Sequence, residues 1–147
     1  MSTVSACRGV RGATCVAENT APAIAAATRE LLQAMLEANA IVADDIASIF
    51  FAATPDLDAA HPATAARELG LGDAALLCMT EIAVPGAPER CIRVLLHWNT
   101  TRSQAAIEHI YLGQAAALRP ERQWPRQPSA GQPAAPQREP ARPEAPQ

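Results

Sequence analysis

The spacing of apolar residues along the chain predicts one long helix and several strands. Apolar positions recur every three or four residues between Ile24 and Ala38, which indicates an amphipathic helix that ends near Asn39. Thr20 can cap the start of this helix, and Pro22 is tolerated in its first turn.

The other apolar runs are short enough to be strands. The run at 46–53 is apolar apart from Ser48, so we expect a strand that is buried on both faces. Two short helices are expected between strands, one over 63–69 that is closed by Gly70 and one over 103–107. The predicted strands cover residues 4–16, 46–53, 74–79, 91–98 and 110–118.

This order of elements is typical of an α+β fold. We expect a mixed sheet of four to five strands, covered by one long helix plus the short helices. A single long helix cannot cover such a sheet on both sides. The remaining apolar face is therefore expected to pack against another subunit.

The last part of the chain differs in composition from the rest. Residues 120–147 hold eight of the thirteen prolines, together with four Arg, three Glu and Trp124 as the one large apolar side chain. Such a segment cannot bury enough apolar surface to offset the entropy lost on ordering. We therefore expect one folded domain over 1–119 and a disordered tail over 120–147.

Charge and composition exclude several classes of protein. The net charge is −3 and every strong cation is Arg, with no Lys, so no broad basic surface for nucleic acid is expected. No apolar run is long enough to cross a membrane and the N-terminus does not resemble a signal peptide. The four cysteines show no CxxC spacing and no nearby His, so we expect no metal site and free thiols that act as small apolar groups. A cytoplasmic protein fits this pattern best.

Arg93 lies in the middle of the most apolar run, 91–98. A guanidinium cannot lose its charge, and burying it without a partner is costly. Its partner is either a structural carboxylate such as Glu81 or an anionic ligand. Arg11 and Arg119 also fall within or at the end of predicted strands, so three Arg and one Glu could form a site that suits a ligand with more than one carboxylate.

No residues in the sequence indicate covalent catalysis or a cofactor. The chain has three histidines, His61, His97 and His109, and none has a Ser or Cys partner at a recognisable motif spacing. We expect His97 and His109 to be structural. There is no phosphate-binding or dinucleotide-binding glycine motif and no HExxH. An enzyme with this sequence would therefore depend on the placement of charge.

Six segments in order resemble one enzyme family. The segments are Arg8-Gly9-Val10-Arg11-Gly12-Ala13-Thr14, Thr54-Pro55-Asp56-Leu57, Pro62-Ala63 with Ala66-Arg67-Glu68-Leu69, Cys78-Met79-Thr80-Glu81, Cys91-Ile92-Arg93-Val94, and His109-Ile110-Tyr111-Leu112 with Leu118-Arg119-Pro120. Together they resemble the monofunctional chorismate mutases of the trimeric, pseudo-α/β-barrel (AroH) class, over about residues 8–120.

The resemblance implies a homotrimer with an active site at each subunit interface. It also implies the reaction, a Claisen-type [3,3] rearrangement of chorismate to prephenate in phenylalanine and tyrosine biosynthesis. The ether C–O bond breaks as a C–C bond forms, and partial negative charge develops on the ether oxygen. No cofactor, metal, membrane or nucleic acid is implied.

The resemblance also implies a role for individual residues. Arg93 and Arg11 would bind the carboxylates and face the ether oxygen, and Glu81 would hold the ring hydroxyl together with Cys78. Substrate-binding or wall positions would be Tyr111, Arg67, Arg119, His61, Ala63, Thr64 and Leu118. The segment from His61 to Arg67 would come from the neighbouring subunit.

Two positions depart from the family pattern. The family usually has an aromatic residue where His61 stands and a Lys where Thr64 stands, so a weaker hold on chorismate is expected. Two other functions stay open at this point. One is a non-catalytic trimer that binds a small carboxylate, and the other is a YjgF-like imine or enamine deaminase, which also uses an interface Arg.

Overall fold

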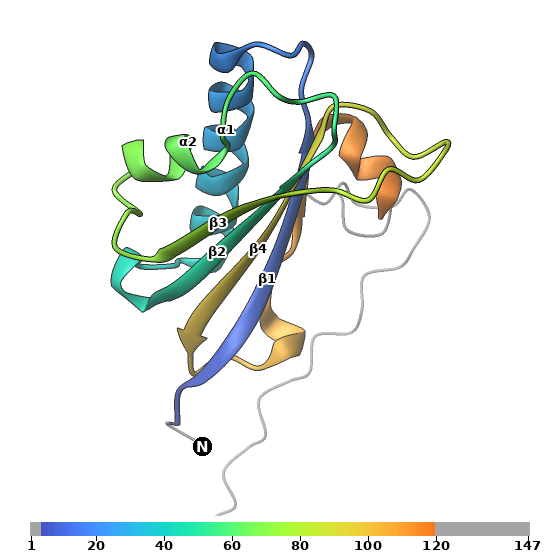
Figure 1. Ribbon diagram of the computed structural model, residues 1–147. Coiled ribbons are helices and arrows are strands. Elements are labelled where there is room, and N and C mark those ends of the chain that lie inside the picture. The colour runs from blue at the N-terminus through green and yellow to red at the C-terminus, as the bar shows by residue number, and fades with distance from the viewer. Residues whose placement is uncertain (1–3, 120–147) are drawn as a thin grey trace, which may run out of the picture.

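The computed structural model describes residues 4–119 as a five-stranded sheet with its two α-helices on one face (Figure 1). The predicted tail at 120–147 lies outside the described residues. The strands are β1 (Ala6–Cys15), β2 (Ile46–Ala53), β3 (Ala75–Thr80), β4 (Cys91–Thr100) and β5 (Ile110–Tyr111). The helices are α1 (Ala21–Asn39) and α2 (Ala63–Glu68), with 3-10 turns η1 (Ala43–Asp45), η2 (Gln104–Ala106) and η3 (Gly113–Leu118).

The sheet is mixed, as the sequence predicts. The strand order is β3-β2-β4-β1-β5, with β4 at the centre and antiparallel to both of its neighbours. The outer strands β3 and β5 run parallel to β2 and β1. The prediction of an α+β fold with one long helix is confirmed.

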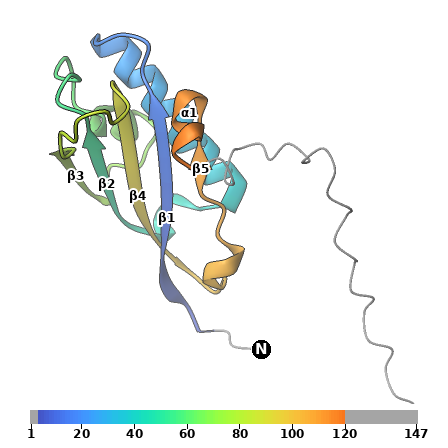
Figure 2. The same cartoon turned by 90° about the vertical axis from the view of Figure 1, so that its right-hand side faces the viewer.

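Helix α1 begins and ends where its sequence predicts. The hydroxyl of Thr20 accepts a hydrogen bond from the N–H of Ala23, and the helix stops at Ala40, whose φ of 53° is left-handed. Its buried residues pack on the sheet beside α2, and both helices lie on the same face (Figure 1). Figure 2 shows the five strands in their order from β3 to β5, with α1 behind them. Arg29 of α1 pairs with Glu68 of α2 over 2.9 Å.

Gly12 lets β1 approach α1 closely. A Cβ atom added to Gly12 would overlap Sδ of Met35 and lie 3.1 Å from Cδ1 of Leu31, and both of these side chains are fully buried. We expect Gly12→Ala to lower the free energy of unfolding by about 1–3 kcal/mol, because the core is overpacked. Urea denaturation measures this change. Gly9→Ala in the same strand is the control, since its Cβ would make ordinary contact with Leu95 at 3.4 Å; equal losses for the two variants would contradict the packing argument.

Two predicted strands differ from the structure. The predicted strand 110–118 is wrong beyond Tyr111, because Gly113 has a φ of 55° and the Ala-rich residues that follow it form η3. The prediction that β2 is buried on both faces is also wrong. Ile49 and Phe51 are fully buried under the helices, whereas Phe50 on the opposite face is partly exposed, because α1 and α2 lie on the other face and η3 packs against β1 rather than β2.

The prediction of four free cysteines is wrong for one pair. Cys15 and Cys91 form a disulfide between directly opposed positions of β1 and β4. Their separation of 76 residues hides the pairing from any local spacing rule. Cys7 and Cys78 are free, as predicted.

The face of the sheet away from the helices carries large apolar side chains. Leu77, Met79 and Leu95 are 53%, 45% and 38% exposed. Leu77 and Met79 come from β3 and Leu95 comes from β4, on either side of β2. This uncovered apolar surface is the one that the sequence assigns to contact with another subunit. In the described part of the chain, no helix has the length and apolar character needed to cross a membrane.

Candidate active site

A cleft of about 680 Å³ lies on the uncovered face of the sheet. Most of the charged residues singled out in the sequence line it. Arg11 and Arg93 come from β1 and β4, and Glu81 and Arg119 follow β3 and η3. The predicted site residues in its lining are Arg11, Glu81, Arg93, Tyr111, Leu118 and Arg119.

The register of the strands explains why these side chains meet. Ala13 of β1 is paired with Arg93 of β4 on one side and with Tyr111 of β5 on the other. Arg11 stands two residues before Ala13 and therefore shares its face. Glu81 follows β3 directly, and its N–H donates to the carbonyl of Ala53 over 2.8 Å, which keeps it beside the sheet.

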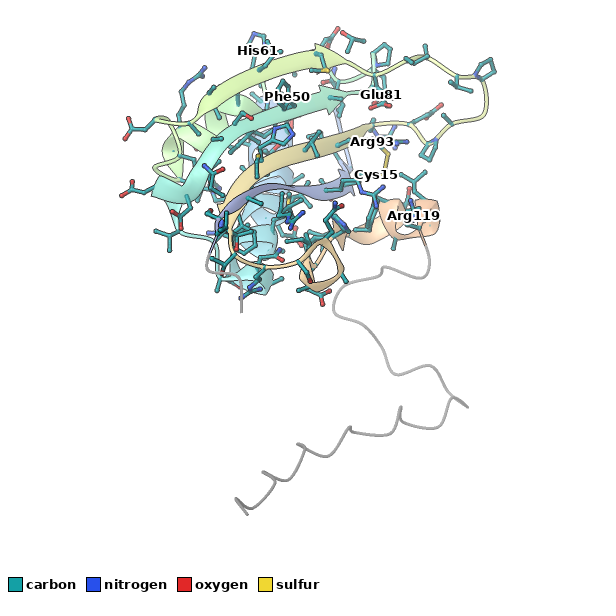
Figure 3. All side chains as sticks on the ribbon, turned by 90° about the horizontal axis from the view of Figure 1, so that it is seen from below. Cys15, Phe50, His61, Glu81, Arg93 and Arg119 are labelled. Atoms are coloured by element: carbon teal, nitrogen blue, oxygen red, sulfur yellow. A yellow bond between two sulfur atoms is a disulfide. The ribbon has the colours of Figure 1, made fainter. Side chains whose placement is uncertain are left out.

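Arg93 and Glu81 form an open ion pair. Nε of Arg93 lies 3.7 Å from Oε2 of Glu81, and the two side chains are 49% and 25% exposed. Figure 3 shows them side by side at one end of the sheet, with Arg119 near the same end. At 3.7 Å the pair is longer than a hydrogen bond, so the guanidinium keeps donors for an anionic guest.

The expectation that Arg93 is buried is wrong for the isolated chain. Ile92 and Val94 point to the helices and are buried, whereas Arg93 points to the uncovered face. The alternation of side chains along a strand causes this difference. Only the face of β4 that points to the helices therefore belongs to the hydrophobic core.

A small hydrogen-bond network fixes the strand just before Arg93. The backbone of Thr54 donates to the carbonyl of Cys91, and the hydroxyl of Thr54 accepts from the N–H of Cys91, both over 3.0 Å. The same hydroxyl donates to Asp56, and this bond is the largest cause that lowers the pKa of the Asp56 carboxyl. Asp56 also accepts from the backbone N–H of Arg90 over 2.9 Å. The start of β4 is thereby tied to the end of β2.

The other predicted site residues lie elsewhere in the chain. His61 and Cys78 line a second cleft of about 450 Å³, and Cys78 shares the helix-side face of the sheet with its register partner Phe51. Glu81 and Cys78 are therefore not brought together within one chain. Ala63, Thr64 and Arg67 belong to α2; Ala63 is buried, while Thr64 and Arg67 are exposed.

The cleft also contains residues to which the sequence assigned no role at the site. Phe50 and His97 are part of its lining, with their rings in an edge contact at 5.5 Å. Nδ1 of His97 is 2.8 Å from the hydroxyl of Ser48. The alternation of side chains along β4 puts His97 on the same face as Arg93, and this pattern could have identified His97 as a cleft residue from the sequence.

The described residues contain no cluster of three or more His, Cys, Asp or Glu side chains that could hold a metal ion. The cleft instead combines three guanidinium groups, one carboxylate and one phenol with apolar walls. Such a set can bind a small molecule with several carboxylates and orient it by charge-assisted hydrogen bonds.

Comparison with known proteins gives a consistent result. The family described as chorismate mutase type I matches residues 7–122. The chain is 49% identical over 115 residues to chorismate mutase AroH of Thermus thermophilus, which covers 78% of this chain and 94% of the relative. It is 40% identical over 115 residues to chorismate mutase AroH of Bacillus subtilis (strain 168), which covers 78% and 91%.

A solved structure supports the same relation. The chorismate mutase from Clostridium thermocellum superimposes with a TM-score of 0.73 and 51% sequence identity, over 74% of this chain and 97% of that chain. The sequence resemblance, the fold and these relatives agree, and the chain belongs to the type I chorismate mutase family.

Proposed function

We propose that this chain is an isomerase that converts chorismate to prephenate in the cleft on the uncovered face of its sheet. The observation that supports this most directly is that Arg11, Arg93 and Arg119 line one cleft whose lining includes a single carboxylate, Glu81. Chorismate carries two carboxylates, so a surplus of positive charge matches it. The family relation favours the same activity.

The proposed mechanism depends on placement and charge. Arg11 and Tyr111 bind a carboxylate of chorismate, and Arg93 faces the ether oxygen. Binding in this way holds the allyl vinyl ether in a compact, chair-like geometry. As the C–O bond breaks and the C–C bond forms, the fixed guanidinium of Arg93 stabilises the charge that develops on the ether oxygen. The step is intramolecular, so it needs no nucleophile.

Glu81 has two roles in this proposal. Its carboxylate accepts a hydrogen bond from the ring hydroxyl of chorismate and orients Arg93 through the open pair at 3.7 Å. Arg119 and Leu118 stand at the mouth and wall of the cleft, and Arg67 would meet the ring carboxylate. The catalytic domain in this proposal is residues 1–119.

The functional unit that we propose is a homotrimer. The apolar side chains Leu77, Met79 and Leu95 are exposed in and next to the cleft, so a neighbouring subunit would cover them. The residues around His61, Cys78 and Arg67 lie away from the cleft of their own chain. A heterologous, ring-closing contact would bring them to the cleft of the next subunit.

Mixed trimers test whether the site is shared. Arg93→Ala damages the cleft half, and Arg67→Glu places a negative charge in the half that the neighbour supplies, so each variant alone is expected to be nearly inactive. The two variants are co-expressed in equal amounts with different tags. Each site needs a cleft half without Arg93→Ala and a neighbouring half without Arg67→Glu, and each of these has a probability of one half. About a quarter of the sites should therefore be intact, which gives about a quarter of wild-type activity. Chorismate turnover by the purified mixed trimers is the measurement.

A matched pair of variants controls this experiment. Arg93→Ala mixed with Glu81→Ala should give no recovery, because both substitutions lie in the same half of the site. Activity of the first mixture that does not exceed the mean of its parents would show that the site is not shared.

The activity itself is tested by the loss of chorismate absorbance with and without protein, with identification of prephenate as product. Binding of a bicyclic dicarboxylate mimic of the transition state without turnover would instead indicate a carboxylate-binding protein. Hydrolysis of an imine without mutase activity would indicate a deaminase. We place the reaction in aromatic amino acid biosynthesis in the cytoplasm, and the acidic net charge of −3 argues against nucleic acid as a partner.

A further inference from the structure

The main chain of Arg11 is held by a side chain that lies outside the cleft. The N–H of Arg11 donates a hydrogen bond to Nδ1 of His109 over 2.9 Å, in a partly buried position. The two residues are 98 apart in the sequence. His109 lines an adjoining pocket of about 310 Å³, and Arg11 lines both this pocket and the cleft. The imidazole can therefore influence the cleft through Arg11.

The short length of β5 explains why a side chain is needed here. Strand β5 pairs Gly12 with Ile110 and Ala13 with Tyr111, and its register does not extend back to Arg11. A backbone N–H inside a sheet needs an acceptor. His109 stands opposite Arg11 just before β5 begins, and its ring nitrogen supplies the acceptor.

The donor determines the protonation of the ring. A backbone N–H can only donate, so Nδ1 of His109 carries a lone pair and the ring proton is on Nε2. A doubly protonated imidazole has no acceptor and could not make this bond. The structure thus requires a neutral His109 in one tautomer.

The segment around His109 is anchored to the helix layer as well. Nδ2 of Asn39 donates to the carbonyl of Glu108 over 2.9 Å, and the N–H of Glu108 donates to Oδ1 of Asn39 over 2.8 Å. Asn39 is fully buried at the end of α1. Tyr111, a cleft residue, follows two positions after His109. The segment is therefore fixed by α1, and His109 couples it to Arg11.

We propose that His109 is a positioning residue of the mutase reaction, an inference that rests on the proposed function. Its neutral imidazole fixes the main chain of Arg11 and thereby the point from which the guanidinium reaches into the cleft. It also sets the distance between Arg11 and Tyr111, which would bind the same carboxylate. His109 itself does not touch the substrate.

Two variants of nearly equal shape test this inference. His109→Asn places an acceptor oxygen where Nδ1 stands, and His109→Leu fills the same space without an acceptor. We expect His109→Leu to lower kcat/KM about tenfold, the size of one hydrogen bond, while His109→Asn stays within about threefold of wild type. In an Arg11→Ala background, the difference between the Leu and Asn variants should disappear, because His109 acts through Arg11.

The outcomes that overturn the inference are distinct. Equal losses for the Leu and Asn variants would show that the acceptor is not needed. A loss of the same size with and without Arg11 would show a general structural role. Asn39→Ala is the control for such a role, since it loosens the same segment but leaves the bond to Arg11 intact, so its effect should persist in the Arg11→Ala background.

A second measurement uses the native protein and needs no variant to fold. Two-bond ¹⁵N–¹H correlation spectra report which ring nitrogen carries the proton, and we expect Nε2 to be protonated and Nδ1 to be bare. A proton on Nδ1 would overturn the inference. This spectrum tests the bond even if the native protein does not turn over chorismate, so failure of the proposed function and failure of this inference can be told apart.

Discussion

Arg93→Ala is expected to reduce kcat/KM for chorismate by about 10²–10³, which corresponds to about 2.7–4 kcal/mol of lost transition-state stabilisation. The guanidinium lies in the cleft, half exposed, with an open ion pair to Glu81. It is therefore available to meet an oxygen that becomes partly anionic as the ether bond breaks. Steady-state kinetics of the purified variant measure the loss.

The charge is the property that this prediction tests. Replacement of Arg93 by citrulline keeps the shape and three of the five N–H donors but replaces one terminal NH2 with a carbonyl oxygen and removes the charge, so most of the loss should remain. Near-full activity of the citrulline protein would contradict the electrostatic mechanism. The folded state should survive Arg93→Ala, because the side chain is 49% exposed.

Arg29 offers a matched control in the same chain. Its side chain is 41% exposed and pairs with Glu68, but it lies on the helix layer, away from the cleft. Arg29→Ala should leave kcat/KM unchanged and cost at most about 1 kcal/mol of stability, as expected for an exposed ion pair.

Glu81→Ala is expected to give the second large effect, a loss of about 10- to 100-fold in kcat/KM. This is the size of one hydrogen bond to a charged group, about 1.5–3 kcal/mol. The variant removes the proposed acceptor for the ring hydroxyl and the partner that orients Arg93 at 3.7 Å. Glu81→Gln keeps an acceptor oxygen without the charge, so its loss should be intermediate.

The control for Glu81 is Glu68, the carboxylate of the ion pair between α1 and α2. Glu68→Ala removes a carboxylate that lies 2.9 Å from Arg29 on the helix side, and its kinetics should match wild type. If Glu81→Ala also retained activity within about twofold, no acceptor at this position would be needed for transition-state stabilisation. The fold should tolerate both substitutions, because both carboxylates are solvent-accessible.

Local periodicity predicted most of the fold. Helix α1 spans Ala21–Asn39 with Thr20 as its cap, and β2 spans Ile46–Ala53, both as predicted. These elements follow from the spacing of apolar side chains and from local capping chemistry, which involve only neighbouring residues. The predicted strand at 110–118 was wrong because Gly113 and the alanines after it favour a turn over a strand.

The sequence also selected the charged residues of the cleft. Arg11, Glu81 and Arg93 stood out because charges in or beside strands need partners, and the structure brings all three to one cleft. The sequence could not reveal that Cys78 and His61 line a different cleft. Their position depends on which face of the sheet each side chain lies on, and this is set only when the strands pair.

By itself, the sequence determined the types of element, the alternation of faces along each strand and the identity of the charged groups. The tertiary structure alone decided the half-exposed state of Arg93, the disulfide between Cys15 and Cys91, and the bond from Arg11 to His109. The physical reason is distance along the chain. The two bonds join residues 76 and 98 positions apart, and the exposure of Arg93 depends on how distant segments pack around it. Such contacts follow from strand order and register, which no local pattern specifies.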